Sequence, residues 1–329
     1  MKAYQVTRYG KNEKLKLSEI SKPVINDNEV LVEVHAASVN LIDAKIRNGE
    51  FKMLMPFIPP FTIGHDVAGI VTQVGAKVSK FKIGDEVYAS SRGTFAEFIS
   101  LNENHLALKP KNSTMEEAAS IPLVSLTAWQ VLVEKGNLKK GQKVLIQAGS
   151  GGVGTIAIQL AKHLGAYVAT TTSSANTDLV KKLGADLIID YKTQDFETIL
   201  KDYDLVLNSQ DAKTLEKSLK VLKPGGKAIS ISGPPDVDFA TETGLNWLLK
   251  NLTRLLSFKI KRLAKKLQVQ YSFHFMRPDG KQLSEIRALI EAGIIRPVID
   301  KVFQFSETNE AIAYVEAGRS KGKAVVKVK

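Results

Sequence analysis

The pattern of hydrophobic and polar positions changes along the chain and predicts two kinds of structure. Residues 1–119 carry short apolar runs that alternate with polar positions and are separated by glycine-containing turns, as at residues 30–34, 64–74 and 81–88. Short strands at regular spacing are typical of a small barrel-like domain. We therefore expect the first part of the chain to be rich in β-strands.

From about residue 120 onward the pattern alternates between strands and helices. A helix is expected over residues 115–134, with Thr114 as its N-cap. Further strands are expected at 143–147, 167–172, 187–190, 205–207, 227–232, 298–305 and 324–329, and helices at 176–183, 212–222, 283–292 and 307–317. In its middle part this βαβ alternation predicts a doubly wound parallel sheet that binds its ligand at the carboxyl ends of the strands.

The clearest functional motif follows the strand at 143–147. Gly149, Gly151 and Gly154 fit the pattern G-x-G-x-x-G between a strand and a helix. The first glycine permits a sharp turn, the second lets backbone N–H groups approach a pyrophosphate, and the third lets helix and strand pack closely. The cofactor-binding residues predicted in this turn are Gly149, Ser150, Gly151, Gly152 and Val153.

Residues 243–268 form a basic helical pattern in which lysines and arginines are interleaved with leucines. We favour a helix that packs its leucines on the protein. The alternative is peripheral contact with a membrane surface.

Composition narrows the class of protein. The 329 residues suffice for two domains, and 44% hydrophobic with 24% charged residues is ordinary for a globular protein. The chain has no cysteine, which excludes disulfides, thiolate catalysis and cysteine-based metal sites. We expect no signal peptide, no transmembrane segment and a cytoplasmic location.

The formal net charge of +12 favours anionic partners, which include nucleotide phosphates, nucleic acid and an anionic membrane surface. A solvated, lysine-rich surface is the interpretation that we favour. We expect no specific nucleic-acid partner.

Several segments together resemble one family. They are residues 37–40, 43–45, 49, 64–69, 84–87, 118–122, 126–128, the glycine turn and 223–226. In this order they resemble the medium-chain dehydrogenase/reductase superfamily, and most of all its zinc-independent branch of quinone oxidoreductases and enone (alkenal) reductases. The resemblance covers essentially the whole chain.

The resemblance implies an α/β fold with two domains. A GroES-like, β-rich catalytic domain is expected at residues 1–119, completed by about residues 269–329. A Rossmann dinucleotide-binding domain with a doubly wound parallel sheet is expected at 120–268. Relatives often dimerise through the edge of the Rossmann sheet, so a homodimer is a further expectation.

The segment after the second strand of the parallel sheet favours NADPH over NADH. Sites that prefer NAD carry an Asp or Glu there for the ribose 2′-OH, and this chain has none before Asp178. Hydroxyl and amide groups can instead donate hydrogen bonds to a 2′-phosphate, although several quinone oxidoreductases carry a lysine at the position of Asn176. The residues predicted here are Thr172, Ser173, Ser174, Asn176 and, by the resemblance, Tyr191, whose alternative is an ordinary strand-end aromatic residue.

No metal is expected. The zinc dehydrogenases of the superfamily use a cysteine and a histidine where this chain has residues 38–40 and His65, so no closed tetrahedral ligand set remains. We expect His65 to be hydrogen-bonded. Without a metal, the protein must reduce a conjugated acceptor by other means. It must hold the nicotinamide against the acceptor, exclude water and supply a hydrogen-bond donor for the enolate oxygen.

The resemblance assigns roles to single residues. Asn40 is expected near the nicotinamide and substrate, and Lys45 beside the enolate oxygen, with a plain surface lysine as the alternative. Asp43 is expected to fix Lys45 or its loop. Phe273 lies in an aromatic run, 273–275, that we expect in the link back to the first domain. The cofactor residues implied by the resemblance are Asn40, Thr127, Ser232, Gly233, Phe273 and Lys323, the last of these near the phosphates.

The sequence thus predicts an NADPH-dependent oxidoreductase that transfers a hydride to quinones or to α,β-unsaturated aldehydes and ketones without zinc. The alternative is an NADPH-regulated nucleic-acid-binding or structural protein of the same fold with little turnover.

Overall fold

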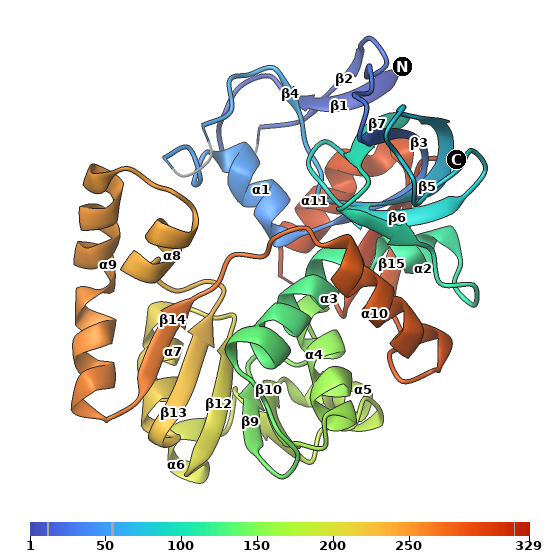
Figure 1. Ribbon diagram of the computed structural model, residues 1–329. Helices are drawn as coiled ribbons and strands as arrows, with labels where there is room; N and C mark the ends of the chain where they lie inside the picture. Colours follow the sequence, from blue (N-terminus) through green and yellow to red (C-terminus); the bar gives the residue numbers. More distant parts are fainter. Residues whose placement is uncertain (12, 54–55, 319) are drawn as a thin grey trace. The chain divides into compact units, whose positions relative to one another are not determined.

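The computed structural model describes residues 1–11, 13–53, 56–318 and 320–329, and it divides into two compact units. Unit 1 comprises Met1–Leu126 with Pro278–Lys329, and unit 2 comprises Thr127–Arg277 (Figure 1). Unit 2 therefore begins and ends a few residues later than the Rossmann domain that we predicted at 120–268.

Unit 1 is built around its longest strand, β3 (Glu29–Val39). The other strands are β1 (Lys2–Val6), β2 (Lys16–Glu19), β4 (Phe61–Thr62), β5 (Asp66–Val74), β6 (Glu86–Ser90), β7 (Phe98–Asn102), β8 (Leu106–Leu108), β15 (Ile299–Gln304) and β16 (Lys323–Lys327). The main sheet has the order β15-β16-β3-β5-β6-β8, with β7 also paired to β3, and β2-β1-β4 form a smaller sheet. Because β16 pairs antiparallel with β3, residues from both ends of the chain meet in one sheet.

The core of unit 1 follows the strand period of two. Val30, Val32 and Val34 of β3 lie with Val67 and Val71 of β5 in one buried cluster. Alternate residues of a strand point to the same face, so these valines cover one face of the sheet. The β-rich character predicted for the first part of the chain is therefore confirmed.

The helix predicted over residues 115–134 is divided. The observed segments are α2 (Met115–Ala119), α3 (Pro122–Trp129) and a π-helical turn, η1 (Gln130–Lys135). Thr114 caps α2 as predicted, because its Oγ1 accepts a hydrogen bond from the N–H of Glu117 at 3.1 Å. The division falls at Pro122, whose ring has no N–H to donate and clashes with the preceding turn of a continuous helix. Of these segments, α2 belongs to unit 1, α3 crosses the boundary at Leu126 and η1 belongs to unit 2. The other helices of unit 1 are α1 (Leu41–Asn48), α10 (Gly280–Glu291), η3 (Phe305–Glu307) and α11 (Thr308–Glu316).

Unit 2 contains a six-stranded sheet in which every neighbouring pair is parallel. The strands are β9 (Lys143–Ile146), β10 (Tyr167–Thr172), β11 (Leu187–Asp190), β12 (Tyr203–Asn208), β13 (Leu222–Ser230) and β14 (Gln270–Phe273). The helices are α4 (Gly152–His163), η2 (Ser174–Asn176), α5 (Thr177–Lys182), α6 (Phe196–Ile199), α7 (Ala212–Lys220), α8 (Val237–Glu242) and α9 (Trp247–Lys266). The order β11-β10-β9-β12-β13-β14 is that of a doubly wound fold, so this prediction is confirmed (Figure 1).

Two stretches of unit 2 differ from the prediction. Residues 270–273 form the sixth strand, β14, instead of part of a link to the first domain. The helix expected from residue 243 begins only at Trp247, because Gly244 adopts a φ of +68° and Asn246 caps the first turn. In the described part of the chain, no helix has both the length and the apolar character needed to cross a bilayer.

Candidate cofactor and active site

The glycine turn between β9 and α4 in unit 2 has the close packing that its pattern predicts. A Cβ atom on Gly149 would lie 2.1 Å from Thr170 Oγ1, and one on Gly154 would lie 2.3 Å from the carbonyl oxygen of Ala148. A Cβ on Gly151 would meet only that same oxygen, at 3.3 Å. Gly149 and Gly154 are thus required for packing, whereas Gly151 leaves space beside the turn, as the close approach of a pyrophosphate demands.

The first turn of α4 offers free backbone donors. Gly151 is the N-cap of this helix, and no side chain caps it. The first backbone N–H groups of a helix have no partner within the helix, and the helix dipole adds positive potential at the same place. Gly152 and Val153 open this turn, so the segment fits an anion such as a pyrophosphate.

The predicted adenosine-end residues gather around Ser150. Thr172 Oγ1 donates to Ser150 Oγ at 3.0 Å, and Asn176 Nδ2 donates to the same atom at 3.1 Å and to Ser173 Oγ at 3.4 Å. Asn176 Oδ1 is shielded from solvent and has no hydrogen-bond partner among the described residues. This unpaired acceptor fits a hydroxyl or amine donor of a bound nucleotide.

Ser174 and Tyr191 are placed differently from the rest of this group. The N–H of Ser174 donates to Asp190 Oδ2 at 3.1 Å, so this backbone group is already used within the protein. Hydrogen bonds from the N–H groups of Lys192 and Ser174 hold the pKa of Asp190 below its usual range. Tyr191 is 61% exposed at the end of β11. A carboxylate so close to residues 172–176 was not predicted from the sequence.

The end of β13 is fixed by internal hydrogen bonds. Ser230 Oγ accepts from the N–H groups of Ser232, at 3.3 Å, and Gly233, at 2.8 Å. Phe273, at the end of β14, is buried and packs edge-on against Phe239 with ring centroids 5.0 Å apart. Thr127 is buried in α3.

Two further residues lie at the carboxyl ends of β12 and β14, the strands on either side of β13, where a doubly wound sheet binds its ligand. Asn208 ends β12 and His274 follows β14; Asn208 Oδ1 and His274 Nε2 are buried without a partner in the described structure. Burial lowers the pKa of His274 to about 4, so the ring is neutral near pH 7. We missed Asn208, although a polar residue that ends an apolar strand is the available signal.

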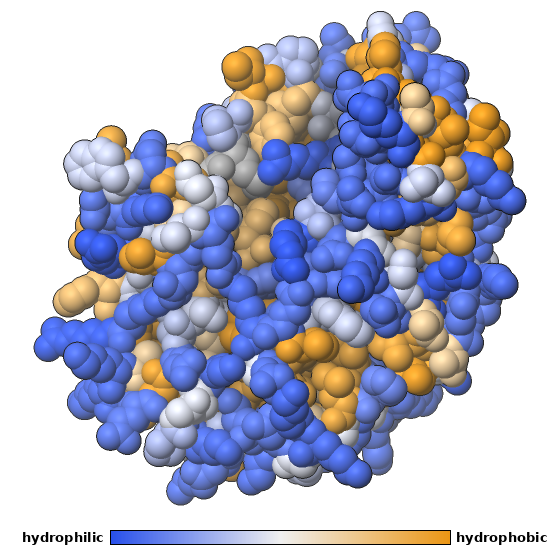
Figure 2. Space-filling view, viewed as in Figure 1, coloured by the Kyte–Doolittle hydropathy of each residue, from blue (hydrophilic) through white to orange (hydrophobic). Residues whose placement is uncertain are grey.

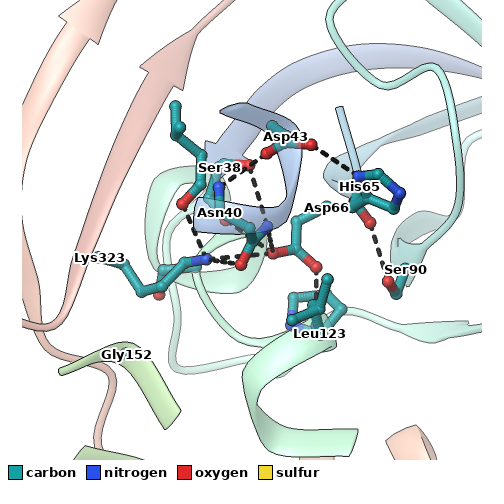
Figure 3. A network of polar contacts seen from close by, with 12 residues as sticks. Ser38, Asn40, Asp43, His65, Asp66, Ser90, Leu123, Gly152 and Lys323 are labelled. Atoms are coloured by element: carbon teal, nitrogen blue, oxygen red, sulfur yellow. Dashed lines mark hydrogen bonds and ion pairs between the residues drawn. The ribbon is translucent and has the colours of Figure 1, made fainter. Parts of the chain in front are cut away.

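In unit 1, a buried polar network surrounds Asn40 (Figure 3). Asn40 Nδ2 donates to Asp66 Oδ2 at 2.8 Å, and the Lys323 ammonium donates to Asn40 Oδ1. Lys323 Nζ also donates to the Val39 carbonyl oxygen at 3.1 Å and lies 3.3 Å from Asp66 Oδ2. These contacts hold the Asn40 amide in one orientation, because a cation faces its oxygen and a carboxylate faces its nitrogen.

Lys323 has a role different from the one implied by the resemblance. Its ammonium has three N–H groups, and the structure directs them at Val39, Asn40 and Asp66. Burial lowers its pKa, while the carboxylates of Asp66 and Asp43 oppose this effect. In unit 1 this lysine therefore positions Asn40 and leaves no N–H for a phosphate.

A second pair in unit 1 fixes the start of α1. Asp43 Oδ2 accepts from the N–H of Asn40 at 2.7 Å, and Asp43 Oδ1 lies 2.6 Å from His65 Nδ1. Asp43 was predicted to fix either Lys45 or its loop, and in the structure it fixes the loop at Asn40. The predicted hydrogen bond of His65 is confirmed. Lys45 lies half-buried in the last turn of α1.

Within residues 1–11, 13–53, 56–318 and 320–329, no group of three or more His, Asp or Glu side chains is placed to hold a metal ion. Two family models match the chain. The alcohol dehydrogenase GroES-like domain matches residues 26–111, and the zinc-binding dehydrogenase family matches residues 183–326.

Named proteins and solved structures are similar over essentially the whole chain. NAD(P)H oxidoreductase RTN4IP1, mitochondrial, of Danio rerio is 37% identical, covering 100% of this chain and 91% of that protein. NADPH-dependent alkenal/one oxidoreductase, chloroplastic, of Arabidopsis thaliana is 35% identical, covering 99% of this chain and 79% of that protein. The solved quinone oxidoreductase from Coxiella burnetii has a TM-score of 0.87 at 30% identity, covering 100% of this chain and 99% of that one.

A GroES-like segment followed by a doubly wound dinucleotide-binding sheet defines the class of medium-chain dehydrogenases and reductases. The chain belongs to the branch of this superfamily that contains the quinone oxidoreductases and enone (alkenal) reductases. The predicted family and α/β fold are confirmed. The predicted cytoplasmic location is wrong, because the Danio rerio and Arabidopsis thaliana relatives, which match essentially the whole chain, are named as mitochondrial and chloroplastic proteins.

Proposed function

We propose that this protein is an NADPH-dependent reductase that transfers a hydride to quinones or to α,β-unsaturated aldehydes and ketones. The observation that carries the proposal is the glycine turn with its uncapped helix and the polar cluster at Ser150, which fit a dinucleotide. Relatives of at least 30% identity are named as an NADPH-dependent alkenal/one oxidoreductase and a quinone oxidoreductase. The alternative of a nucleic-acid-binding protein gains no support from these names.

Unit 2 holds the cofactor in this proposal. The pyrophosphate lies at the Gly149–Gly154 turn, and the 2′-phosphate accepts hydrogen bonds from the hydroxyl and amide groups of Ser150, Ser173 and Asn176. The remaining predicted contacts of the cofactor are Thr127, Thr172, Ser174, Tyr191, Ser232, Gly233 and Phe273.

NADPH is preferred over NADH because the segment 172–176 carries no carboxylate of its own. Asp190, which binds the Ser174 N–H, is already engaged by two backbone donors. The negative charge of Asp190 makes the preference for NADPH over NADH smaller than in a site that has no carboxylate nearby. It leaves the hydrogen-bond donors at Ser150 and Asn176 in place.

The residues of unit 1 orient and stabilise the acceptor. When bound, NADPH supplies a hydride from nicotinamide C4. For an enone the new C–H bond forms at the β-carbon, the electron pair of the C=C bond moves onto the carbonyl oxygen, and a solvent proton completes the product at the α-carbon. Asn40 donates to the developing oxyanion through the amide N–H that does not bind Asp66, whose contact in the structure is the Ser38 carbonyl oxygen at 3.5 Å. Lys45 adds positive charge nearby. A quinone gains one hydride and one proton in the same way.

A panel of acceptors tests the function. Purified protein is mixed with NADPH and, in turn, with quinones, 2-alkenals, enones and a saturated ketone as control, and the loss of NADPH absorbance is followed. We expect turnover with at least one conjugated acceptor, none with the saturated ketone, and a KM for NADPH well below that for NADH. Absence of turnover with every conjugated acceptor contradicts the proposal.

The homodimer expected for this family is also proposed. Strand β14 lies at one edge of the parallel sheet, and an edge strand offers backbone groups for pairing with a second chain. Light scattering coupled to size exclusion measures the mass directly, and a mass equal to the 36.0 kDa chain contradicts a dimer.

A further inference from the structure

The longest helix of unit 2, α9, turns its large apolar side chains toward solvent. Its buried residues are mostly small or polar: Thr253, Ser257, Ile260 and Ala264. The most exposed apolar residues are Trp247 (70%), Leu248 (60%), Leu255 (73%) and Phe258 (60%). The leucine packing that we predicted is found at Leu263 and Leu267, which pack on the core, and is wrong for this exposed face.

The exposed apolar residues form one stripe. Leu248, Leu255 and Phe258 are separated by seven and three residues, and these intervals bring side chains back to the same side of a helix. Figure 2 shows hydrophobic and hydrophilic side chains mixed over this part of unit 2. The face is therefore a strip of large apolar groups bordered by polar ones.

The charged residues of α9 are all basic. The helix carries seven lysines and arginines and no Asp or Glu. Lys259 pairs with Glu216 at 2.5 Å and Lys261 with Asp236 at 2.9 Å. Elsewhere on this fully described helix the structure shows no ion pair for the basic residues, which are Lys250, Arg254, Arg262, Lys265 and Lys266.

We propose that α9 docks on the surface of an anionic lipid bilayer. The helix lies in the plane of the interface, with Trp247, Leu255 and Phe258 at the boundary between headgroups and acyl chains. Arg262, Lys265 and Lys266 contact the lipid phosphates. A helix with Trp, Phe and Leu on one face and Lys and Arg on its borders is the type that binds such an interface without crossing it.

Charge distinguishes this occupant from a second copy of the chain. Two α9 helices facing each other across a two-fold axis bring basic residues together without an acidic partner on either helix. An anionic bilayer complements the same face and also accommodates its apolar stripe. The proposal does not depend on the reductase activity.

Flotation with lipid vesicles tests this interface. Full-length protein is mixed at low salt with vesicles of phosphatidylcholine alone or of phosphatidylcholine with phosphatidylglycerol. We expect flotation only with the anionic vesicles. The double variants Leu255→Ser/Phe258→Ser and Lys265→Gln/Lys266→Gln each weaken the apparent affinity about tenfold or more. Added salt lowers the affinity of the wild type and has less effect on the lysine variant.

Matched changes on unit 1 serve as controls. Val24→Ser/Ile83→Ser removes two exposed apolar side chains, and Lys14→Gln/Lys16→Gln removes two exposed charges. We expect both controls to float like the wild type, and all variants to keep its thermal unfolding midpoint. The proposal is overturned if the wild type does not float, if the controls lose flotation equally, or if the α9 variants change a wild-type dimer into a monomer.

Discussion

Asp66 is the residue on which the buried network of unit 1 depends most. Its Oδ1 accepts from the N–H of Leu123 at 2.7 Å, and its Oδ2 accepts from Ser38 at 2.9 Å and from Asn40 at 2.8 Å. The carboxylate also pairs with Lys323, and both side chains are buried. One charged group therefore binds four donors from three separate segments of the chain.

The first prediction concerns this pair. Asp66→Asn leaves a buried lysine without its nearest counter-charge, so the free energy of unfolding falls by about 3–5 kcal/mol in urea titration. The control is Asp27→Asn, which breaks the exposed pair with Lys77 and costs within about 1 kcal/mol. Equal losses in the two variants contradict the structural role of Asp66.

The second prediction concerns Asn176. Its amide donates to Ser150 and Ser173 in the segment assigned to the 2′-phosphate. Asn176→Asp replaces this donor with a negative charge, so the ratio of kcat/KM for NADPH to that for NADH falls about a hundredfold or more. Asn176→Gln keeps the amide and retains most of the preference. An unchanged ratio in the Asp variant places the 2′-phosphate elsewhere.

The third prediction concerns pH. Burial holds the pKa of His274 at about 4 in the folded protein, against 6.5 for an unburied histidine. Between these pH values the unfolded chain therefore binds a proton that the folded chain does not. The contribution of His274 to the free energy of unfolding is therefore complete above about pH 6.5. It is lost as the pH falls toward 4, which lowers the free energy of unfolding by about 3 kcal/mol.

His274→Phe removes this loss, so its free energy of unfolding changes less between pH 7 and pH 4 than that of the wild type. His163→Gln, at an exposed position of α4, is the control and keeps the wild-type dependence. A wild-type pH dependence in the His274 variant contradicts the assignment.

At the residue scale, the sequence pointed to individual polar side chains but did not predict the contacts between them. Asn40 and Lys323 were both named, but 283 positions separate them in the chain. Their contact exists because β16 pairs with β3, and no local pattern encodes such a pairing. For the same reason the role of Lys323 was assigned to phosphates instead of to the Asn40 amide.

At the scale of single elements, the glycine turn provides the sharpest prediction. Gly151→Ala adds a methyl group with one neighbour at 3.3 Å, whereas Gly154→Ala places it 2.3 Å from a backbone oxygen. We expect Gly151→Ala to keep the thermal midpoint within a few degrees and to raise the Kd for NADPH about tenfold. Gly154→Ala lowers stability by about 1–3 kcal/mol. If both variants bind NADPH more weakly and are equally stable, the assignment of Gly151 to cofactor approach and of Gly154 to packing is contradicted.

Elements with strong local signals were predicted well. The strands Tyr167–Thr172 and Leu187–Asp190 have the predicted bounds, because each is rich in β-branched residues and has a glycine shortly before it. The helix broken at Pro122 and the short edge strand β14 were missed. Strand β14 is as short as Leu187–Asp190, but its sequence QYSF mixes polar and aromatic residues and continues into the aromatic run 273–275, so it has no apolar run that marks a strand.

At the scale of the whole molecule, the order of strands and helices predicted two domains and the doubly wound sheet. The boundaries of the units were less predictable, since they depend on which segments pack together after folding. The exposed face of α9 was equally unpredictable. A leucine-rich helix has the same sequence pattern whether its leucines are buried or exposed.

The proposed function requires direct hydride transfer from NADPH to a conjugated acceptor. The measurement is mass spectrometry and NMR of an enone reduced by this protein with NADPH deuterated at both C4 positions, in ordinary water. We expect one deuterium in each product molecule, at the former β-carbon, and hydrogen from solvent at the α-carbon. A reduced product without deuterium at the β-carbon contradicts it.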